Sequence, residues 1–170
     1  SDRISLSYGW THKWIQDLTK LGVFRLTRMK AYLNENNQFY KRTLRYIKDT
    51  SSNNVQFYYE ALSLFGIAYC FTKTDAVFIW TRGGYNIARY RAFYPIFIKV
   101  EKKDKALFEE YCKKLDLHIK NKKGIFYQAY YLDNFDFEYC DGIPVDTIGE
   151  TISFIKNNKY NFEPALEMIK

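Results

Sequence analysis

Large apolar residues near the start of the chain recur at a helical spacing, along one stripe of a cylinder. The residues of this stripe are Trp10, Trp14, Leu18 and Leu21. Ser7 can cap such a helix at its N-terminus, and Gly22 can end it because glycine readily adopts the left-handed conformation. The pattern predicts a helix over residues 8–21, with the stripe, widened by Ile15, as its core face.

Two short runs typical of strands follow this helix, at residues 23–27 and 30–34. They are joined by a tight basic turn around Arg28 and Met29. A second helical pattern covers residues 37–48. Its inner side is predicted to carry the apolar residues Phe39, Leu44 and Ile47.

Six polar residues at 49–54 predict a linker, after which helical and strand patterns alternate. Helices are predicted over 55–65, 74–80, 103–115, 147–156 and 163–169. Strands are predicted over 67–72, 91–100, 117–120, 125–132, 135–139 and 143–145. Pro95 indicates an edge position or a bulge, because proline has no N–H to donate. The order predicts an α+β fold: a partial winged helix-turn-helix over 1–50, then a small α/β domain over 55–170 with a mixed sheet.

Positive charge is concentrated in the first of these segments. The whole chain carries 26 basic and 19 acidic residues, for a net charge of +7. Residues 1–50 hold ten of the basic and four of the acidic residues, a net +6, which leaves 16 basic and 15 acidic residues in 51–170. A polyanion attracts such a module because binding releases its condensed counterions.

The polar side chains of this basic segment are of the types that contact phosphates or read base edges. On the predicted first helix these polar side chains lie outside the apolar stripe, and in the ribbon they lie around the turn. We predict nine nucleic-acid-binding residues: Tyr8, Thr11, His12, Lys13, Gln16, Lys20, Arg25, Arg28 and Lys30. The alternative is a solvated basic helix and hairpin within one fold.

The segment Ser7–Phe24, SYGWTHKWIQDLTKLGVF, resembles the recognition helix and first wing strand of winged helix proteins. A complete helix-turn-helix has one or two helices before its recognition helix, and six residues precede Ser7. Either those helices are missing from this fragment, or the segment is not a winged helix. In the first case the Trp10 and Trp14 stripe needs another cover, such as a second chain or the 37–48 helix.

Few residues of the chain form a pattern typical of catalysis or metal binding. Cys70, Cys112 and Cys140 are widely spaced, which argues against zinc and disulfides and fits a reducing cytoplasm. No apolar run approaches 18 residues, so we expect a soluble cytoplasmic protein without membrane contact. Gly83-Gly84 lacks the surroundings of a phosphate loop. We predict no catalytic residue, metal site or cofactor.

Four carboxylates gather between residues 133 and 141. They are Asp133, Asp136, Glu138 and Asp141. Because Asp136 and Glu138 alternate with aromatic residues, a solvated sheet face explains them better than a metal site, whose ligands must converge.

Three stretches of the later segment resemble the C-terminal domain of AbiEi-type abortive-infection antitoxins. They are 60–72 (EALSLFGIAYCFT), 94–100 (YPIFIKV) and 141–152 (DGIPVDTIGETI). That family places a winged helix domain first, so the resemblance implies an antitoxin-like regulator. The strand order also resembles a reduced nucleotidyltransferase fold. Thr72-Lys73-Thr74 stands where active members have Gly-Gly or Gly-Ser, and 94–98 lacks the carboxylates that hold Mg²⁺.

These patterns lead to the hypothesis of a DNA-binding transcriptional regulator, antitoxin-like, with a non-catalytic C-terminal interaction domain. Its expected partners are double-stranded DNA, a cognate toxin protein and a second copy of the chain in a homodimer. One alternative is a divergent metal-dependent nucleotidyltransferase or nuclease that acts on nucleic acid through the acids at 133–141. Another is a protein-interaction module whose basic charge is incidental.

Overall fold

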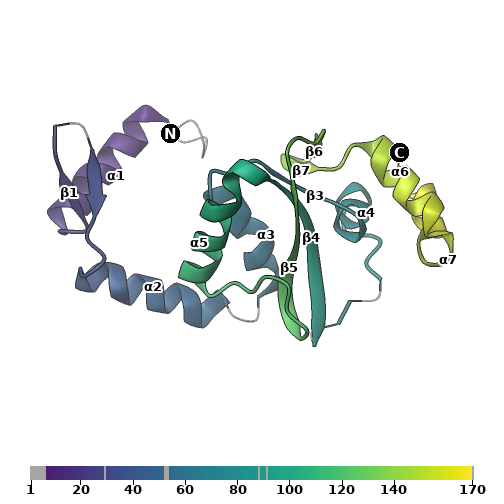
Figure 1. The fold of residues 1–170 in the computed structure, drawn as a ribbon, viewed down its shortest axis with the longest axis horizontal. Helices are drawn as coiled ribbons and strands as arrows, with labels where there is room; N and C mark the ends of the chain where they lie inside the picture. The colour runs from purple at the N-terminus through teal and green to yellow at the C-terminus, as the bar shows by residue number, and fades with distance from the viewer. Residues whose placement is uncertain (1–6, 29, 52–53, 88, 91, 170) are drawn as a thin grey trace. The chain divides into compact units, whose positions relative to one another are not determined.

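A computed structural model describes residues 7–28, 30–51, 54–87, 89–90 and 92–169 (Figure 1). The chain divides into two compact units. The first comprises Ser1–Gly66 with Lys114–Asp116, and the second comprises Ile67–Lys113 with Leu117–Lys170. The helix that follows the predicted linker groups with the first unit; the division into a basic module and an α/β domain stays a prediction.

The first unit consists of helices and a two-stranded antiparallel ribbon. Its elements are α1 (Tyr8–Lys20), β1 (Phe24–Leu26), β2 (Ala31–Leu33), α2 (Gln38–Ser51) and α3 (Val55–Leu64). The predicted helix, ribbon and second helix are confirmed in this order. Helix α2 continues to Ser51, so half of the predicted linker is helical; Ser52 and Asn53 lie outside the described residues.

The second unit is built on a mixed five-stranded sheet in the order β5-β4-β3-β7-β6. The strands are β3 (Tyr69–Phe71), β4 (Phe93–Glu101), β5 (Gly124–Leu132), β6 (Glu138–Cys140) and β7 (Ile143–Val145). The helices are α4 (Thr74–Trp80), α5 (Lys105–Leu115, up to Lys113 in this unit), α6 (Ile148–Asn157) and α7 (Lys159–Phe162), with the 3-10 helices η2 (Lys102–Asp104) and η3 (Glu163–Glu167). The predicted α+β class with a mixed sheet is confirmed.

Strand β4 lies inside the sheet, which corrects the edge position expected from Pro95. It runs parallel to β5 over its whole length and antiparallel to β3. However, β3 is short and pairs only with residues 98–100 of β4. Pro95 is therefore beyond the reach of β3, and its missing N–H costs no hydrogen bond of the ladder.

Helix α5 lies beside the sheet (Figure 1). The two are in contact through aromatic rings. The ring of Phe108 meets Tyr127 and Tyr131 of β5 edge to face, at centroid distances of 5.6 and 6.3 Å. Ile96 and Ile98 of β4 are fully buried in the core of the unit. Such ring pairs add to the free energy gained by burying apolar area.

A second apolar cluster joins the helices after β3 and β7. It contains Val77, Ile155, Phe162 and Ala165. The predicted helix over 163–169 is here a 3-10 turn, in line with Pro164 near its start. The predicted strand over 117–120 is also wrong, because only Ile119 forms a bridge, to Tyr127. None of the helices in the described ranges combines the length and hydropathy needed to cross a bilayer.

The most deeply buried ion pair of the second unit joins α4 to the segment before β4. Asp75 and Arg89 have almost no exposed side-chain surface, and their Oδ1 and Nη1 atoms are 2.6 Å apart. The other oxygen of Asp75 accepts a hydrogen bond from the N–H of Phe97, at 2.7 Å. The guanidinium carbon lies 4.7 Å from the ring centroid of Tyr94 and 5.5 Å from that of Phe78. A strand, a helix and a loop thus depend on one carboxylate.

We expect Asp75→Asn to lower the free energy of unfolding by about 3–5 kcal/mol, because it leaves the Arg89 guanidinium buried without a counter-charge. Urea unfolding followed by circular dichroism measures the loss. The matched control is Asp133→Asn, whose carboxylate pairs with Lys102 at 2.7 Å on an exposed surface and is worth at most about 1 kcal/mol. Equal losses in the two variants would contradict this assignment.

Candidate nucleic-acid interface

Helix α1 begins with a cap made by Ser7. Its hydroxyl accepts a hydrogen bond from the N–H of Trp10 at 3.4 Å, while Thr11 donates its hydroxyl back to the Ser7 carbonyl at 3.0 Å. The ring of Tyr8 stacks on His12 one turn later, with centroids 6.1 Å apart. The N-terminal turn is therefore ordered by its own side chains, as the capping pattern predicts.

The C-terminal end of α1 is closed by Gly22, which has φ of +69°. The N–H of Gly22 donates to Thr19 and that of Val23 to Leu18, the paired bonds by which a glycine commonly ends a helix. A side chain here would be strained, and its Cβ would lie 3.3 Å from Nδ2 of Asn37. The glycine lets the chain turn at once into β1.

Two asparagines hold the ribbon and α2 to this helix end. Asn37 donates its amide to the Leu21 carbonyl at 2.8 Å, and its side-chain oxygen accepts from the N–H of Tyr40 at the start of α2. Asn34 donates to the Gly22 carbonyl at 3.2 Å. Neither asparagine stands out in the sequence; the position of Asn37 just before a helical pattern was the available signal.

The turn of the ribbon is closed by Thr27 and Lys30. The N–H of Thr27 donates to the Lys30 carbonyl at 2.8 Å, and the N–H of Lys30 donates to the Thr27 hydroxyl at 3.2 Å. Arg28 lies in this turn with its side chain exposed, and Met29 lies outside the described residues. The ribbon therefore presents a basic tip.

The structure places eight of the nine predicted binding residues on the surface. The exposed ones are Tyr8, His12, Lys13, Gln16, Lys20, Arg25, Arg28 and Lys30. Thr11 is half-buried and its hydroxyl is used by the helix cap. On a helix of 3.6 residues per turn, Lys13, Gln16 and Lys20 fall on one side, roughly opposite the half-buried Ile15 and Leu18.

The expected core face of α1 is wrong for most of its members. Trp10, Trp14 and Leu21 are 59%, 57% and 51% exposed, whereas Ile15, Leu18 and Thr19 are half-buried. The ribbon covers only one narrow side of α1, and the tryptophans lie next to that side. Nζ of Lys13 is 5.4 Å from the ring centroid of Trp10, so the apolar stripe borders the basic face.

Helix α2 adds further exposed basic side chains to the first unit. They are Lys41, Arg42 and Arg45. Leu44 and Ile47 are half-buried as predicted, but Phe39 is 51% exposed, which corrects its expected inner position. It lies in the first turn of α2, directly after the polar residues 34–37.

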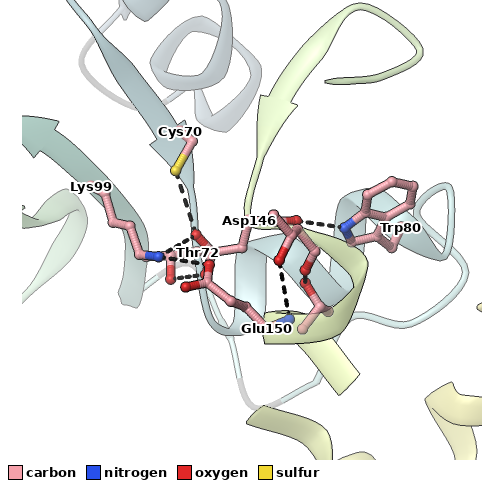
Figure 2. A network of polar contacts seen from close by, with 8 residues as sticks. Cys70, Thr72, Trp80, Lys99, Asp146 and Glu150 are labelled. Carbon is pink, nitrogen blue, oxygen red and sulfur yellow. Dashed lines mark hydrogen bonds and ion pairs between the residues drawn. The ribbon is translucent and has the colours of Figure 1, made fainter. Parts of the chain in front are cut away.

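In the second unit, polar side chains converge on Asp146, directly after β7 (Figure 2). Thr72 donates its hydroxyl to one oxygen, and the other accepts from Lys99 at 2.9 Å and from the thiol of Cys70 at 3.4 Å. The indole N–H of Trp80 donates to the Asp146 carbonyl at 2.9 Å. Lys99 also pairs with Glu150 of α6 at 2.9 Å. The network joins β3, β4, α4 and α6.

Burial and the nearby carboxylates decide the protonation of this network. Burial, then the charge and hydrogen bond of Asp146, raise the pKa of the Cys70 thiol, so it stays protonated and donates. Burial by itself lowers the pKa of Lys99, but its hydrogen bonds and charge interactions with Asp146 and Glu150 outweigh this and raise it. The arrangement keeps a positive charge beside a carboxylate whose oxygens are held by protein donors.

The carboxylates at 133–141 are spread from the end of β5, at one edge of the sheet, to the turn after β6, at the other edge. Asp133 pairs with Lys102 at 2.7 Å and Asp141 with Arg82 at 3.5 Å. Asp136 and Glu138 are exposed. Over the described ranges, no three His, Cys, Asp or Glu side chains are grouped so as to hold a metal ion.

Comparison of the chain with known proteins finds no matching family model, no matching curated protein and no matching solved structure. The function is therefore inferred from the residues and geometry described above.

We expect Asn37→Ala to loosen the junction of α1, ribbon and α2 without unfolding the second unit. The variant loses an acceptor worth about 1 kcal/mol at the start of α2, together with the donor to Leu21. Amide hydrogen exchange should rise at Tyr40 and in the ribbon. Asn36→Ala is the control, because the exposed Asn36 side chain only accepts from Lys41 Nζ. Its backbone N–H, which the substitution keeps, donates to Oδ1 of Asn34.

We expect Asp146→Asn to lower the free energy of unfolding by about 3 kcal/mol, because Lys99 loses its buried counter-charge. Urea unfolding followed by circular dichroism measures the loss.

The raised pKa of Lys99 means that the folded chain holds the proton of this side chain more tightly than the unfolded chain. This stabilisation is complete below pH 10.5 and is lost as the pH rises above that value. Melting temperatures across this range should fall less in Lys99→Met than in the wild type; an equal fall would contradict the assignment.

Proposed function

We propose that the chain is a DNA-binding transcriptional regulator, antitoxin-like, that contacts the duplex through α1 and the β1–β2 ribbon. The observation that carries this proposal is the exposed polar side of α1, opposite its packed side, together with the exposed basic tip of the ribbon that follows α1 in the chain. The same segment holds nearly all of the net charge of the chain. A phosphate backbone is the polyanion that such a surface fits best.

The dimensions of α1 suit a major groove. Its 13 residues span about 20 Å at 1.5 Å per residue, and the groove of B-DNA is about 12 Å wide, enough to admit one helix. Lys13, Gln16 and Lys20 lie along one side of the helix, each about one turn after the one before. They can therefore follow successive base pairs or phosphates. His12 and Gln16 are the candidates for base contacts.

The ribbon takes the place of a wing in this proposal. Arg25, Arg28 and Lys30 are exposed, and the closed turn at Thr27 and Lys30 fixes the direction of the tip. Such cations act on phosphates or in a minor groove. Trp10, which lies beside Lys13, can contact sugar or base edges at the border of the same surface.

The proposal assigns protein contacts, including those with a cognate toxin, to the α/β unit. The buried carboxylates of that unit accept from protein donors. Asp75 accepts from Arg89 and Phe97, Asp104 from the N–H of Ala68, and Asp146 from Thr72, Cys70 and Lys99. Carboxylates bonded in this way hold the fold of the unit together.

We expect duplex DNA to bind with an affinity that falls linearly with the logarithm of the salt concentration. Lys13→Ala, Arg28→Ala and Lys30→Ala should each reduce the slope by about 1, because each removes one phosphate contact. Fluorescence anisotropy of a labelled duplex over a salt series measures the slope. Lys156→Ala, an exposed lysine of α6, is the charge-matched control and should leave the slope unchanged.

A binding constant that does not respond to salt, or no binding below about 100 mM salt, would contradict the proposal. Changes at His12 and Gln16 test base contacts separately. Their alanine variants should keep the salt slope and change the preference among duplexes of different sequence.

A further inference from the structure

Strand β6 forms one edge of the five-stranded sheet in the part of the chain that the structure describes. It is joined to β7 by a two-residue turn, Asp141-Gly142, in which both residues have positive φ, 49° and 81°. This turn type matches the twist of a hairpin and fixes the register of its strands. The edge is therefore rigidly presented.

The backbone of Tyr139 points away from β7. In an antiparallel pair, opposed residues alternate between those that exchange hydrogen bonds and those that do not. Tyr139 lies opposite Pro144, which has no N–H, between two pairs that exchange bonds. The N–H and C=O of Tyr139 are thus directed to the free edge, where a further strand can pair with them.

Apolar side chains and a hollow accompany this edge. Tyr139 is 67% and Phe137 41% exposed, and their rings meet at a centroid distance of 5.5 Å. Cys140, on the opposite face of β6, lines a hollow of about 280 Å³ together with Trp80, Thr81, Arg82 and Met168. In strand addition, backbone bonds give affinity and such hollows accept alternate side chains of the incoming strand.

The charge at this edge is negative. Asp136 and Glu138 are exposed, and no ion pair is recorded for either among the described residues. Asp141 lies in the turn after β6 and pairs with Arg82 at 3.5 Å, whereas Asp133 follows β5 at the opposite edge of the sheet. A basic strand is therefore the complementary occupant.

The chain itself carries a strand of this kind, in the β1–β2 ribbon. All three residues of β2 are exposed. Tyr32 and Leu33 point to opposite faces of the strand, so one of them can enter the hollow while the other lies on the face of Tyr139. Arg25, Arg28 and Lys30 give the ribbon its positive charge. The β6 edge and the β1–β2 ribbon thus both carry exposed apolar residues, and their charges are opposite.

We propose that the β6 edge binds the β1–β2 ribbon of a second copy of this chain, by strand addition beside Tyr139. The contact is heterologous, since it uses different surfaces on the two copies. It stands whether or not the chain binds DNA. If the proposed DNA binding is also correct, the two events compete, because both use Arg25, Arg28 and Lys30; by linkage, DNA then weakens self-association to the same degree that self-association weakens DNA binding.

The test is sedimentation of the full chain over a concentration series at low and high salt. We expect the average mass to rise with concentration at low salt and to return to that of the monomer at high salt. Glu138→Lys and Arg25→Glu should each weaken association at least about tenfold, through like-charge contact. Glu163→Lys and Arg45→Glu change exposed residues elsewhere and should associate like the wild type.

Mixing the two charge variants gives the sharpest result. Glu138→Lys keeps an intact ribbon and Arg25→Glu an intact edge, so the mixture should associate more strongly than either variant alone. Tyr139→Pro, with its fold checked by circular dichroism, should also lose association because it removes the outward N–H.

A chain that stays monomeric at every concentration and salt overturns the proposal, as does association that both charge variants retain. Binding of a foreign basic strand peptide by a chain that does not self-associate would assign the edge to another partner. Loss of DNA binding with intact self-association would count against the proposed function alone.

Discussion

The packing of the second unit depends on the network around the carboxylate of Asp146, which joins β3, β4, α4 and α6. Removing a charge from water is costly unless donors replace the water, and here the donors come from elsewhere in the chain: Thr72 and Cys70 from the region of β3, Lys99 from β4. Its own carbonyl holds the indole of Trp80, and α6 starts two residues later. The Asp146 carboxylate therefore finds its donors only when β4, β3 and β7 are arranged in this order.

The first unit is held by weaker means. Apart from Val23 and the end of α2, its basic segment buries little, and the junction of helix, ribbon and helix depends on the amides of Asn34 and Asn37 and on the backbone of Gly22. Hydrogen bonds in contact with water are individually modest. Such a surface can adapt to a partner at a lower cost than the sheet can, which agrees with a role in binding.

Elements whose signals are local were predictable from the sequence. Ser7, Gly22 and the spacing of apolar residues predicted α1 and the start of the ribbon, and the strand predicted over 143–145 is β7. Features that depend on distant residues were not. Periodicity shows that Trp10 and Trp14 share a stripe, but not whether anything covers it. Thr72 and Asp146 are 74 positions apart, so no local pattern could join them.

Likewise, Pro95 signals a missing donor, but only the length of β3 decides whether that donor matters. The nine proposed binding residues rest on residue type and helix geometry; the structure adds that eight are exposed and that the hydroxyl of Thr11 serves the helix cap. The apolar stripe beside them was visible in the sequence, but its exposed position was not.

That position has an optical consequence. Of the three tryptophans in the chain, Trp10 and Trp14 are exposed in the first unit, while Trp80 belongs to the second and has its indole N–H bonded. Tryptophan fluorescence at long wavelength, accessible to an aqueous quencher, therefore reports mainly on α1. The remaining tryptophan fluorescence reports on the second unit, through Trp80 of α4. The two halves of the molecule can be followed separately without any added label.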